Sequence, residues 1–190
     1  MTIPADNPAN VLRFDRHFAG PPSRVFAIWT RPELIAVWFG SSHGFRAQDV
    51  AVDLRPGGRW SLRNIKGAAI EHVGGTYHEV IPDQRLLYSY HFEGTDFWSN
   101  VSVDLAPDGA GTRMQFLQTG FPDRTAFEEH GKGWGFGLQL MIDGLLLAMR
   151  AERSWPATGR LDGVAEDLNA ARRRLSPERG QRGLPTDGSD

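Results

Sequence analysis

The sequence predicts an α+β fold, in which an antiparallel sheet of about seven strands packs against one long helix near the carboxyl end. Three observations predict it. Apolar and polar residues alternate through much of residues 45–118, with the period of two that is typical of strands. Turn sequences such as Pro56-Gly57-Gly58 separate these segments by short links, as in an antiparallel meander. Beyond residue 130, apolar residues recur every three or four positions, which indicates a helix.

The elements follow in a simple order. A first strand is expected over residues 11–18, and a short helix then carries Val25, Phe26 and Trp29, with Ser23 as its expected amino-terminal cap. A second short helix is expected to begin at Pro32. The other six strands are expected within residues 45–54, 59–63, 73–81, 86–92, 97–105 and 112–118. The long helix is expected over residues 131–150, with Gly133 and Gly137 letting it approach the sheet closely.

The composition excludes several classes of function. Of 190 residues, 40% are hydrophobic and 23% are charged, which is typical of a globular domain. The absence of cysteine excludes disulfides, thiolate metal sites and cysteine nucleophiles. A net charge of −2 gives no basic excess for nucleic acid. The first ten residues lack a signal peptide pattern, and Gln139 and Asp143 interrupt the most apolar run, so we expect a cytoplasmic protein without a membrane span.

One domain is expected to occupy residues 11–155. Residues 1–10 and 176–190 are expected to be disordered, because they combine polar and charged residues with almost no aromatic content. Within residues 156–175, apolar side chains at helical spacing predict an amphipathic helix, which we expect to cover the outer face of the sheet or a second subunit. These side chains are Leu161, Val164, Leu168, Ala171 and Leu175.

Several motifs occur in a characteristic order between residues 11 and 150. They are Pro32-Glu33-Leu34, Trp38-Phe39, Asp53-Leu54-Arg55-Pro56-Gly57-Gly58, Gly75-Thr76-Tyr77-His78-Glu79-Val80, Gly111-Thr112-Arg113, Gly120-Phe121 and Gly133-Trp134. In this order they resemble the START-like (SRPBCC) superfamily, and within it the branch named for the activator of the heat-shock-protein-90 ATPase. The resemblance implies a helix-grip fold, in which a strongly curved sheet wraps the carboxy-terminal helix and encloses an apolar cavity.

The resemblance implies less about activity. Members of the superfamily bind lipids, sterols or polyketide-like compounds, some catalyse cyclisation or dehydration, and some bind chaperones. This chain has Gln118 where many relatives have a histidine, which removes one titratable group. It also has Ser41 after Gly40, where many relatives have proline. A role that relatives assign to either position therefore does not carry over to this chain.

Alternation along the strands, the helix stripe and the second short helix together select the side chains that should face the interior. We expect these side chains to bind a ligand: Trp38, Phe39, Trp60, Leu62, Tyr88, Tyr90, Phe97, Ser99, Val101, Met114, Phe116, Gln118, Trp134, Leu138 and Met141. Two interpretations stay open, that they bound a cavity or that they only pack against one another. An empty hollow of about 300 Å³ would cost several kcal/mol, so a persistent cavity would indicate a use.

The polar members of this set admit two interpretations as well. Tyr88, Tyr90, Ser99 and Gln118 could orient an oxygenated ligand by hydrogen bonds, or they could satisfy neighbouring backbone groups. The aromatic and hydroxyl lining suits a flat or lipid-like molecule with one or two polar ends.

The histidines do not form a pattern that predicts a metal site. His72 and His78 are six residues apart on one strand, about 20 Å at the strand rise, so they cannot share an ion. No metal or other cofactor is therefore expected. The run Gly40-Ser41-Ser42-His43-Gly44 matches the pattern of a hydrolase nucleophile elbow, but here a helix precedes it and a strand follows, the reverse of the required context. It is interpreted as a loop at the cavity mouth or as a plain connector.

Three functions stay open. The first is binding of a hydrophobic or lipid-like small molecule in the cavity, and it predicts a closed pocket without paired titratable groups. The second is an enzyme of the cyclase or dehydratase kind, which predicts two convergent titratable groups; no catalytic residue is assigned. The third is a co-chaperone-like interaction module, with a chaperone partner or a second copy of the chain, which predicts a filled core and an exposed apolar patch.

Overall fold

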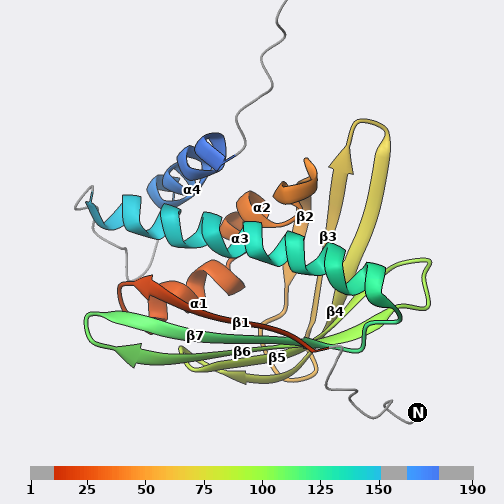
Figure 1. Ribbon diagram of the computed structural model, residues 1–190, viewed down its shortest axis with the longest axis horizontal. Helices are drawn as coiled ribbons and strands as arrows, with labels where there is room; N and C mark the ends of the chain where they lie inside the picture. The colour runs from red at the N-terminus through yellow and green to blue at the C-terminus, as the bar shows by residue number, and fades with distance from the viewer. Residues whose placement is uncertain (1–10, 151–161, 176–190) are drawn as a thin grey trace, which may run out of the picture.

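The computed structural model describes residues 11–150 and 162–175 (Figure 1). The expected disorder of residues 1–10 and 176–190 lies outside these residues. The elements in chain order are β1 (Leu12–Ala19), α1 (Pro22–Thr30), α2 (Pro32–Trp38), the 3₁₀ turn η2 (Ser41–His43), β2 (Arg46–Val52), β3 (Arg59–Lys66), β4 (Ala69–Ile81), β5 (Arg85–Phe92), β6 (Trp98–Asp108), β7 (Gly111–Thr119), α3 (Arg124–Arg150) and α4 (Asp162–Leu175).

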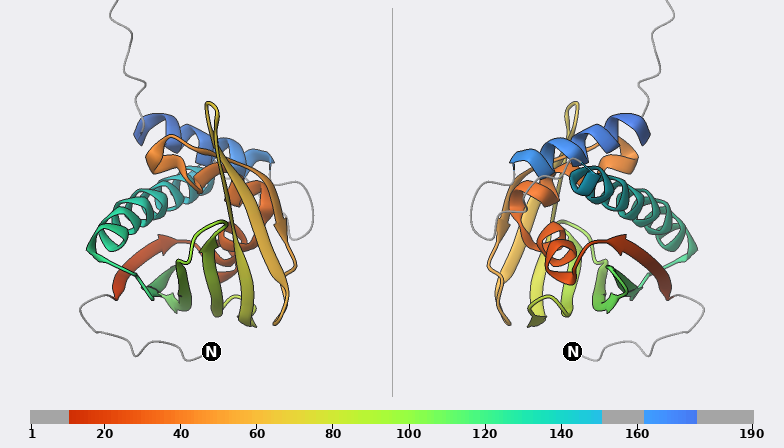
Figure 2. Two further views of the ribbon diagram at one scale, coloured as in Figure 1. Left: turned by 90° about the vertical axis from the view of Figure 1, so that its right-hand side faces the viewer. Right: turned by 90° about the vertical axis from the view of Figure 1, so that its left-hand side faces the viewer.

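The seven strands form one antiparallel sheet in the order β1-β7-β6-β5-β4-β3-β2. Strands β2 to β7 form a meander, and β1 pairs with the last strand, so β1 and β2 are the two edges. The segment with α1 and α2 connects these edges, and α3 lies across the inner side of the bent sheet (Figure 2). This arrangement confirms the predicted α+β helix-grip fold.

The beginning of α1 differs from the prediction. The helix starts at Pro22, and Pro21 is the capping residue without a side-chain hydrogen bond. Ser23 therefore lies inside the first turn, and its expected capping role is wrong. Proline suits the first helical position because its φ is already fixed near the helical value and it has no N–H to leave unpaired.

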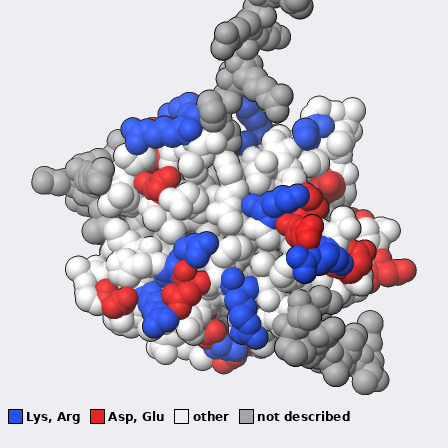
Figure 3. All heavy atoms as spheres, viewed as in Figure 1, with Lys and Arg blue, Asp and Glu red and all other residues white. Residues whose placement is uncertain are grey.

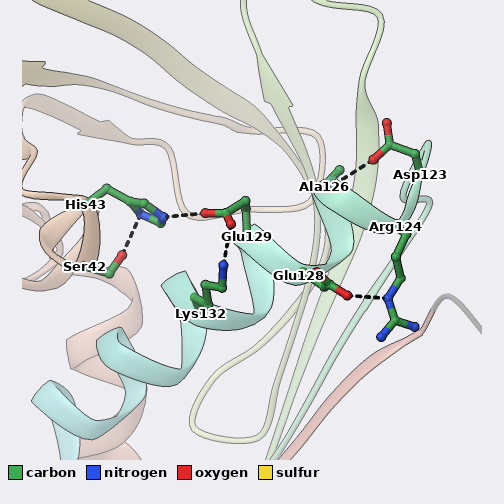
Figure 4. A network of polar contacts seen from close by, with 8 residues as sticks. All are labelled: Ser42, His43, Asp123, Arg124, Ala126, Glu128, Glu129 and Lys132. Atoms are coloured by element: carbon green, nitrogen blue, oxygen red, sulfur yellow. Dashed lines mark hydrogen bonds and ion pairs between the residues drawn. The ribbon is translucent and has the colours of Figure 1, made fainter.

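The long helix α3 begins seven residues before the predicted start. Its first turn is capped by Asp123, whose Oδ1 accepts a hydrogen bond of 2.8 Å from the backbone N–H of Ala126 (Figure 4). The strand β4 also begins earlier than expected, because the β3–β4 hairpin continues until Lys66 pairs with Ala69. This hairpin extends beyond the rest of the sheet in Figure 1.

The expected role of two glycines in α3 is wrong. A Cβ atom on Gly137 would lie 3.5 Å from Cε3 of Trp38, and one on Gly133 would lie 3.4 Å from Cε1 of His43. Trp38 belongs to α2 and His43 to η2. These glycines therefore bring α3 close to the α1–α2 segment and its following loop, and not to the sheet.

The interior between the sheet and the middle of α3 is filled. Met114 and Phe116 on β7 and Leu138 and Met141 on α3 are 0% exposed. The Trp134 ring stacks on Trp29 with 5.6 Å between ring centroids and meets the Phe116 ring at 4.6 Å. These side chains form the core on which the rest of the site is built.

The helix α4 packs against α3 and α2, on the side of α3 that faces away from the sheet (Figure 2). Its Leu168 is 0% exposed, and Arg172 donates a hydrogen bond of 3.3 Å to the carbonyl of Phe45. The expectation that this segment covers the outer face of the sheet is therefore wrong, and its alternative, a contact with a second subunit, stays a prediction. Among the described residues, no helix combines the length and the apolar character that crossing a membrane takes.

Candidate functional site

A pocket of about 520 Å³ lies where the amino-terminal half of α3, the end of α2, the η2 loop and strands β3 to β5 meet. Its wall combines aromatic side chains with as many polar ones. The aromatic members are Trp38, Phe39, Phe45, Tyr90, Phe92, Phe97 and Trp134, and the polar ones are Ser42, His43, Asn64, Lys66, Glu71, Glu129 and His130; Gly40, Ala126 and Gly133 complete the wall. A volume of this size is typical of small-molecule sites.

The pocket includes some of the predicted ligand-binding residues. They are Trp38, Phe39, Tyr90, Phe97 and Trp134. The others lie in the packed interior beyond the pocket wall, none of them more than 7% exposed: Trp60, Leu62, Tyr88, Ser99, Val101, Met114, Phe116, Gln118, Leu138 and Met141. The pocket therefore lies at one end of the space between the sheet and α3, next to the amino-terminal half of α3. It opens to solvent at a rim where the side chains of His43 and Glu129 are 43% and 49% exposed, whereas the sequence predicted an enclosed cavity.

A chain of hydrogen bonds runs beneath the pocket wall, centred on the buried amide of Gln118. Its Oε1 accepts from Nε1 of Trp134 at 2.7 Å and meets Nδ1 of His130 at 3.2 Å. Its Nε2 donates to Oγ of Ser99 at 2.8 Å. An indole N–H can only donate, so the amide oxygen must face Trp134. The same oxygen also faces His130, so Nδ1 of that ring carries the hydrogen.

His130 is surrounded by aromatic rings. The ring centroids of Phe97, Phe121 and Tyr90 lie 5.2, 5.3 and 5.4 Å from its own, each nearly perpendicular to it. Burial among these rings, and after it the nearby His43, lowers the pKa of His130 from 6.5 to about 4. The imidazole is therefore neutral at pH 7. With Nδ1 protonated, Nε2 carries a lone pair that can accept a hydrogen bond.

His130 was not among the ligand-binding residues predicted from the sequence. A single histidine in a helical segment shows no periodicity of its own. Its position four residues before Trp134 is the signal that could have identified it, because residues at that spacing share one face of a helix. Gln118 was predicted as an interior polar residue, and its buried amide indeed binds both His130 and Trp134.

Polar and charged groups bridge the mouth of the pocket. Oγ of Ser42 lies 2.7 Å from Nδ1 of His43, and Nε2 of His43 lies 3.4 Å from a carboxylate oxygen of Glu129 (Figure 4). Nζ of Lys132 lies 2.6 Å from the other oxygen. Lys132, and after it His43, lower the pKa of Glu129. These side-chain contacts join the η2 loop to α3. The loop lines the pocket, as one of the two interpretations of the run at residues 40–44 predicted.

Two further polar side chains of the wall lack a partner among the described residues. Asn64 is 4% exposed, and its Oδ1 forms no hydrogen bond there. A Cβ on Gly40 would lie 2.7 Å from this oxygen, so only glycine fits opposite it. The Tyr90 hydroxyl forms no hydrogen bond with a described residue and is not sealed from solvent. Burial, and then the charge of Glu71, raise the pKa of Tyr90, which stays neutral.

Within residues 11–150 and 162–175, no group of three or more His, Asp or Glu side chains could bind a metal ion. Charges on the face shown in Figure 3 are of both signs and interspersed, in keeping with a net charge of −2. The pocket thus combines aromatic rings with neutral hydrogen-bonding groups, and it has charged side chains of both signs, Lys66, Glu71 and Glu129.

Residues 19–142 match the family described as "Activator of Hsp90 ATPase homolog 1-like protein". The chain belongs to this family. The match confirms the resemblance that the ordered motifs indicated, and it spans the first three-quarters of α3 and the whole sheet except most of β1. No curated protein sequence matches the chain.

Several solved structures share the fold of this family member. Protein CV1439 from Chromobacterium violaceum is 27% identical, with a TM-score of 0.63 over 68% of this chain and 92% of that one. Protein NE0264 from Nitrosomonas europaea is 21% identical, with a TM-score of 0.62 over 87% of this chain and 98% of that one. CalU16 from Micromonospora echinospora is 22% identical, with a TM-score of 0.54 over 87% of each chain.

Proposed function

We propose that the protein binds a hydrophobic small molecule in the pocket between the η2 loop and α3. The observation that carries the proposal is the aromatic wall of a pocket of about 520 Å³ beside a filled core. Two large rings of this wall, Trp38 and Trp134, come from helices that pack directly on one another. A flat apolar molecule would contact both rings and the Tyr90 ring, whose centroid lies 6.3 Å from that of Trp134.

The energetics of the wall support the same function. Aromatic surface that faces water forgoes about 25 cal/mol for each Å² that could be buried. The chain has large side chains to fill its interior elsewhere, as around Phe116, yet glycine stands at Gly133 where a side chain would narrow the mouth. We infer that the pocket stays open because a ligand occupies it.

The distribution of exposed apolar side chains favours the pocket over a docking surface. Outside the pocket, the exposed large apolar residues among the described ones are Leu54, Ile70, Ile81, Trp98 and Leu146, which come from a loop, both ends of β4, β6 and α3. An interaction module would gather such residues into one patch. An enzymatic role on the same pocket and a co-chaperone-like role stay open as alternatives, and the enzymatic role would show as turnover of a bound ligand.

Equilibrium dialysis of the full chain against 1-methoxynaphthalene, a neutral aromatic probe, tests the proposal. We expect one saturable site. Gly133→Leu should weaken binding about tenfold or more, because its side chain enters the mouth beside His43. The matched control is Gly135→Leu on the same helix, since a Cβ there would meet no atom within 4 Å and Gly135 does not line the pocket. Equal weakening by both variants, or no saturable binding, would contradict the proposal.

A further inference from the structure

The pocket wall contains a hydrogen-bond acceptor whose state is set by the protein itself. Trp134 fixes the orientation of the Gln118 amide, and the amide oxygen in turn holds Nδ1–H of His130. The other ring nitrogen, Nε2, therefore presents a lone pair. It forms no hydrogen bond with any described residue and is not sealed from solvent. His130 is one of the residues that line the pocket.

The surroundings make this acceptor selective. Four aromatic rings, those of Tyr90, Phe92, Phe97 and Phe121, pack around His130 and leave little water near it. An acceptor in such a place loses free energy whenever it is covered by an apolar group without receiving a hydrogen bond. A ligand that carries a hydrogen-bond donor at this end is thus favoured over an otherwise identical ligand without one.

A second group narrows the class of donor. The hydroxyl of Tyr90 is neutral and has no partner among the described residues, and its ring lies 5.4 Å from that of His130. It can donate to an oxygen of the ligand. A hydroxyl group is able both to give a hydrogen to Nε2 and to accept one from a phenol. A carboxylate has no hydrogen to donate.

The rim indicates that the ligand is uncharged. Glu71 and Glu129 supply negative charge there, and Lys66 supplies positive charge, with Lys132 paired to Glu129. Neither sign dominates. The selectivity of the pocket therefore depends on neutral hydrogen bonds in its interior and not on an ion pair at its mouth.

We propose that the ligand is an uncharged aromatic or polycyclic molecule with a hydroxyl group, phenolic or alcoholic, which donates to Nε2 of His130 and accepts from the hydroxyl of Tyr90. This inference rests on the proposed function and specifies its ligand class. Gln118 acts as a positioning residue, because it holds the imidazole in the form that accepts.

A matched pair of probes tests the inference. 1-Naphthol and 1-methoxynaphthalene share one aromatic body, but only the first can donate a hydrogen bond. In equilibrium dialysis at pH 7 the unaltered chain should bind 1-naphthol about tenfold more tightly, the effect of one hydrogen bond to a desolvated acceptor. His130→Phe should bind both probes with the affinity that the unaltered chain has for 1-methoxynaphthalene. Tyr90→Phe should weaken the binding of both probes, because each has an oxygen that accepts from the Tyr90 hydroxyl, and should keep the preference for 1-naphthol.

A measurement on the unaltered chain covers the case in which His130→Phe does not fold. Long-range ¹H–¹⁵N spectra should show Nδ1 protonated in the free protein, and 1-naphthol should shift the Nε2 resonance while 1-methoxynaphthalene does not. Equal affinity of the unaltered chain for both probes would overturn the inference and leave the proposed function standing. A preference that survives in His130→Phe would also overturn it. If neither probe binds, both proposals fail.

Discussion

Nε1 of Trp134 donates a hydrogen bond of 2.7 Å to Oε1 of Gln118. The bond joins α3 to β7 across the interior, where Gln118 is 0% exposed and Trp134 is 6% exposed. It fixes the amide in one orientation, because the indole N–H has no acceptor function. This one contact therefore determines which nitrogen of His130 carries the hydrogen, and so that Nε2 is the nitrogen able to accept a hydrogen bond.

Gln118→Leu should therefore destabilise the fold. The substitution leaves the Trp134 N–H and the His130 N–H without their acceptor in a buried place, and we expect a loss of about 2–4 kcal/mol in the free energy of unfolding. Urea denaturation measures it. The matched control is Gln115→Leu on the same strand, whose side chain is exposed, and it should change stability by less than about 0.5 kcal/mol. A similar effect of the two variants would show that the buried amide contributes nothing.

The stability should fall as the pH is lowered from 6.5 toward 4. The pKa of His130 is lowered from 6.5 to about 4, so between these values the unfolded chain binds the proton and the folded chain does not. The neutral imidazole thus contributes stability that is fully present above pH 6.5 and is lost as the pH falls through 4. His130→Phe should lose less stability than the unaltered chain between pH 7 and 4, by about 2–3 kcal/mol.

Urea denaturation at the two pH values measures this difference, and an NMR titration of the His130 ring measures its pKa directly. Other groups, the carboxylates above all, also titrate in this range, so the comparison of the two chains isolates His130. If both chains lost the same stability, or the ring titrated near 6.5, the described burial of His130 would be wrong.

The charged bridge at the mouth should control how fast a ligand leaves. Glu129→Gln removes the charge that attracts His43 and Lys132, and the η2 loop and α3 should separate more readily. We expect faster dissociation of 1-methoxynaphthalene in stopped-flow measurements, with the melting temperature unchanged because the groups are exposed. Glu128→Gln is the control, since Glu128 pairs with Arg124 along α3 and does not line the pocket (Figure 4). Equal dissociation rates in the two variants would contradict the bridge.

The contact between α3 and α4 should depend on Gly144. A Cβ on this residue would lie 2.3 Å from Cδ2 and 3.0 Å from Cα of Leu168, which is 0% exposed, so α4 would have to move. Gly144→Ala should therefore raise the rate of amide hydrogen exchange over Asp162–Leu175. Gly135→Ala has free space around its Cβ and should instead stabilise the helix by up to about 1 kcal/mol. Unchanged exchange in α4 would show that the close contact is not needed.

Strand positions were predictable because one face of each strand is buried. Trp60 and Leu62 on β3, and Met114 and Phe116 on β7, alternate with exposed or half-buried neighbours as the sequence indicated. The start of α3 was not predictable. The apolar stripe that indicated the helix begins only at Trp134, and residues 124–130 show no such stripe, so the sequence did not join them to the helix.

The candidate site could be predicted only in part. The alternation of apolar and polar residues predicted which side chains point inward, among them Tyr90 and Phe97. It did not predict how far along the sheet each one lies from the pocket. Whether an inward residue lines the pocket or fills the core depends on contacts between distant segments, such as Phe116 with Trp134. The spacing from Trp134 could have placed His130 on the inward face, but its acceptor state depends on the hydrogen bond that its Nδ1 donates to Gln118 on β7, which no local pattern encodes.

The most direct test of the central claim is a ¹H–¹⁵N NMR titration of the tryptophan indoles with 1-naphthol. Trp38 and Trp134 line the pocket, whereas Trp98 is 52% exposed on β6 and does not. We predict that the indole signals of Trp38 and Trp134 shift together and saturate with one binding constant, while that of Trp98 stays in place. Signals of Trp38 and Trp134 that do not respond at saturating probe, or a response confined to Trp98, would contradict the account.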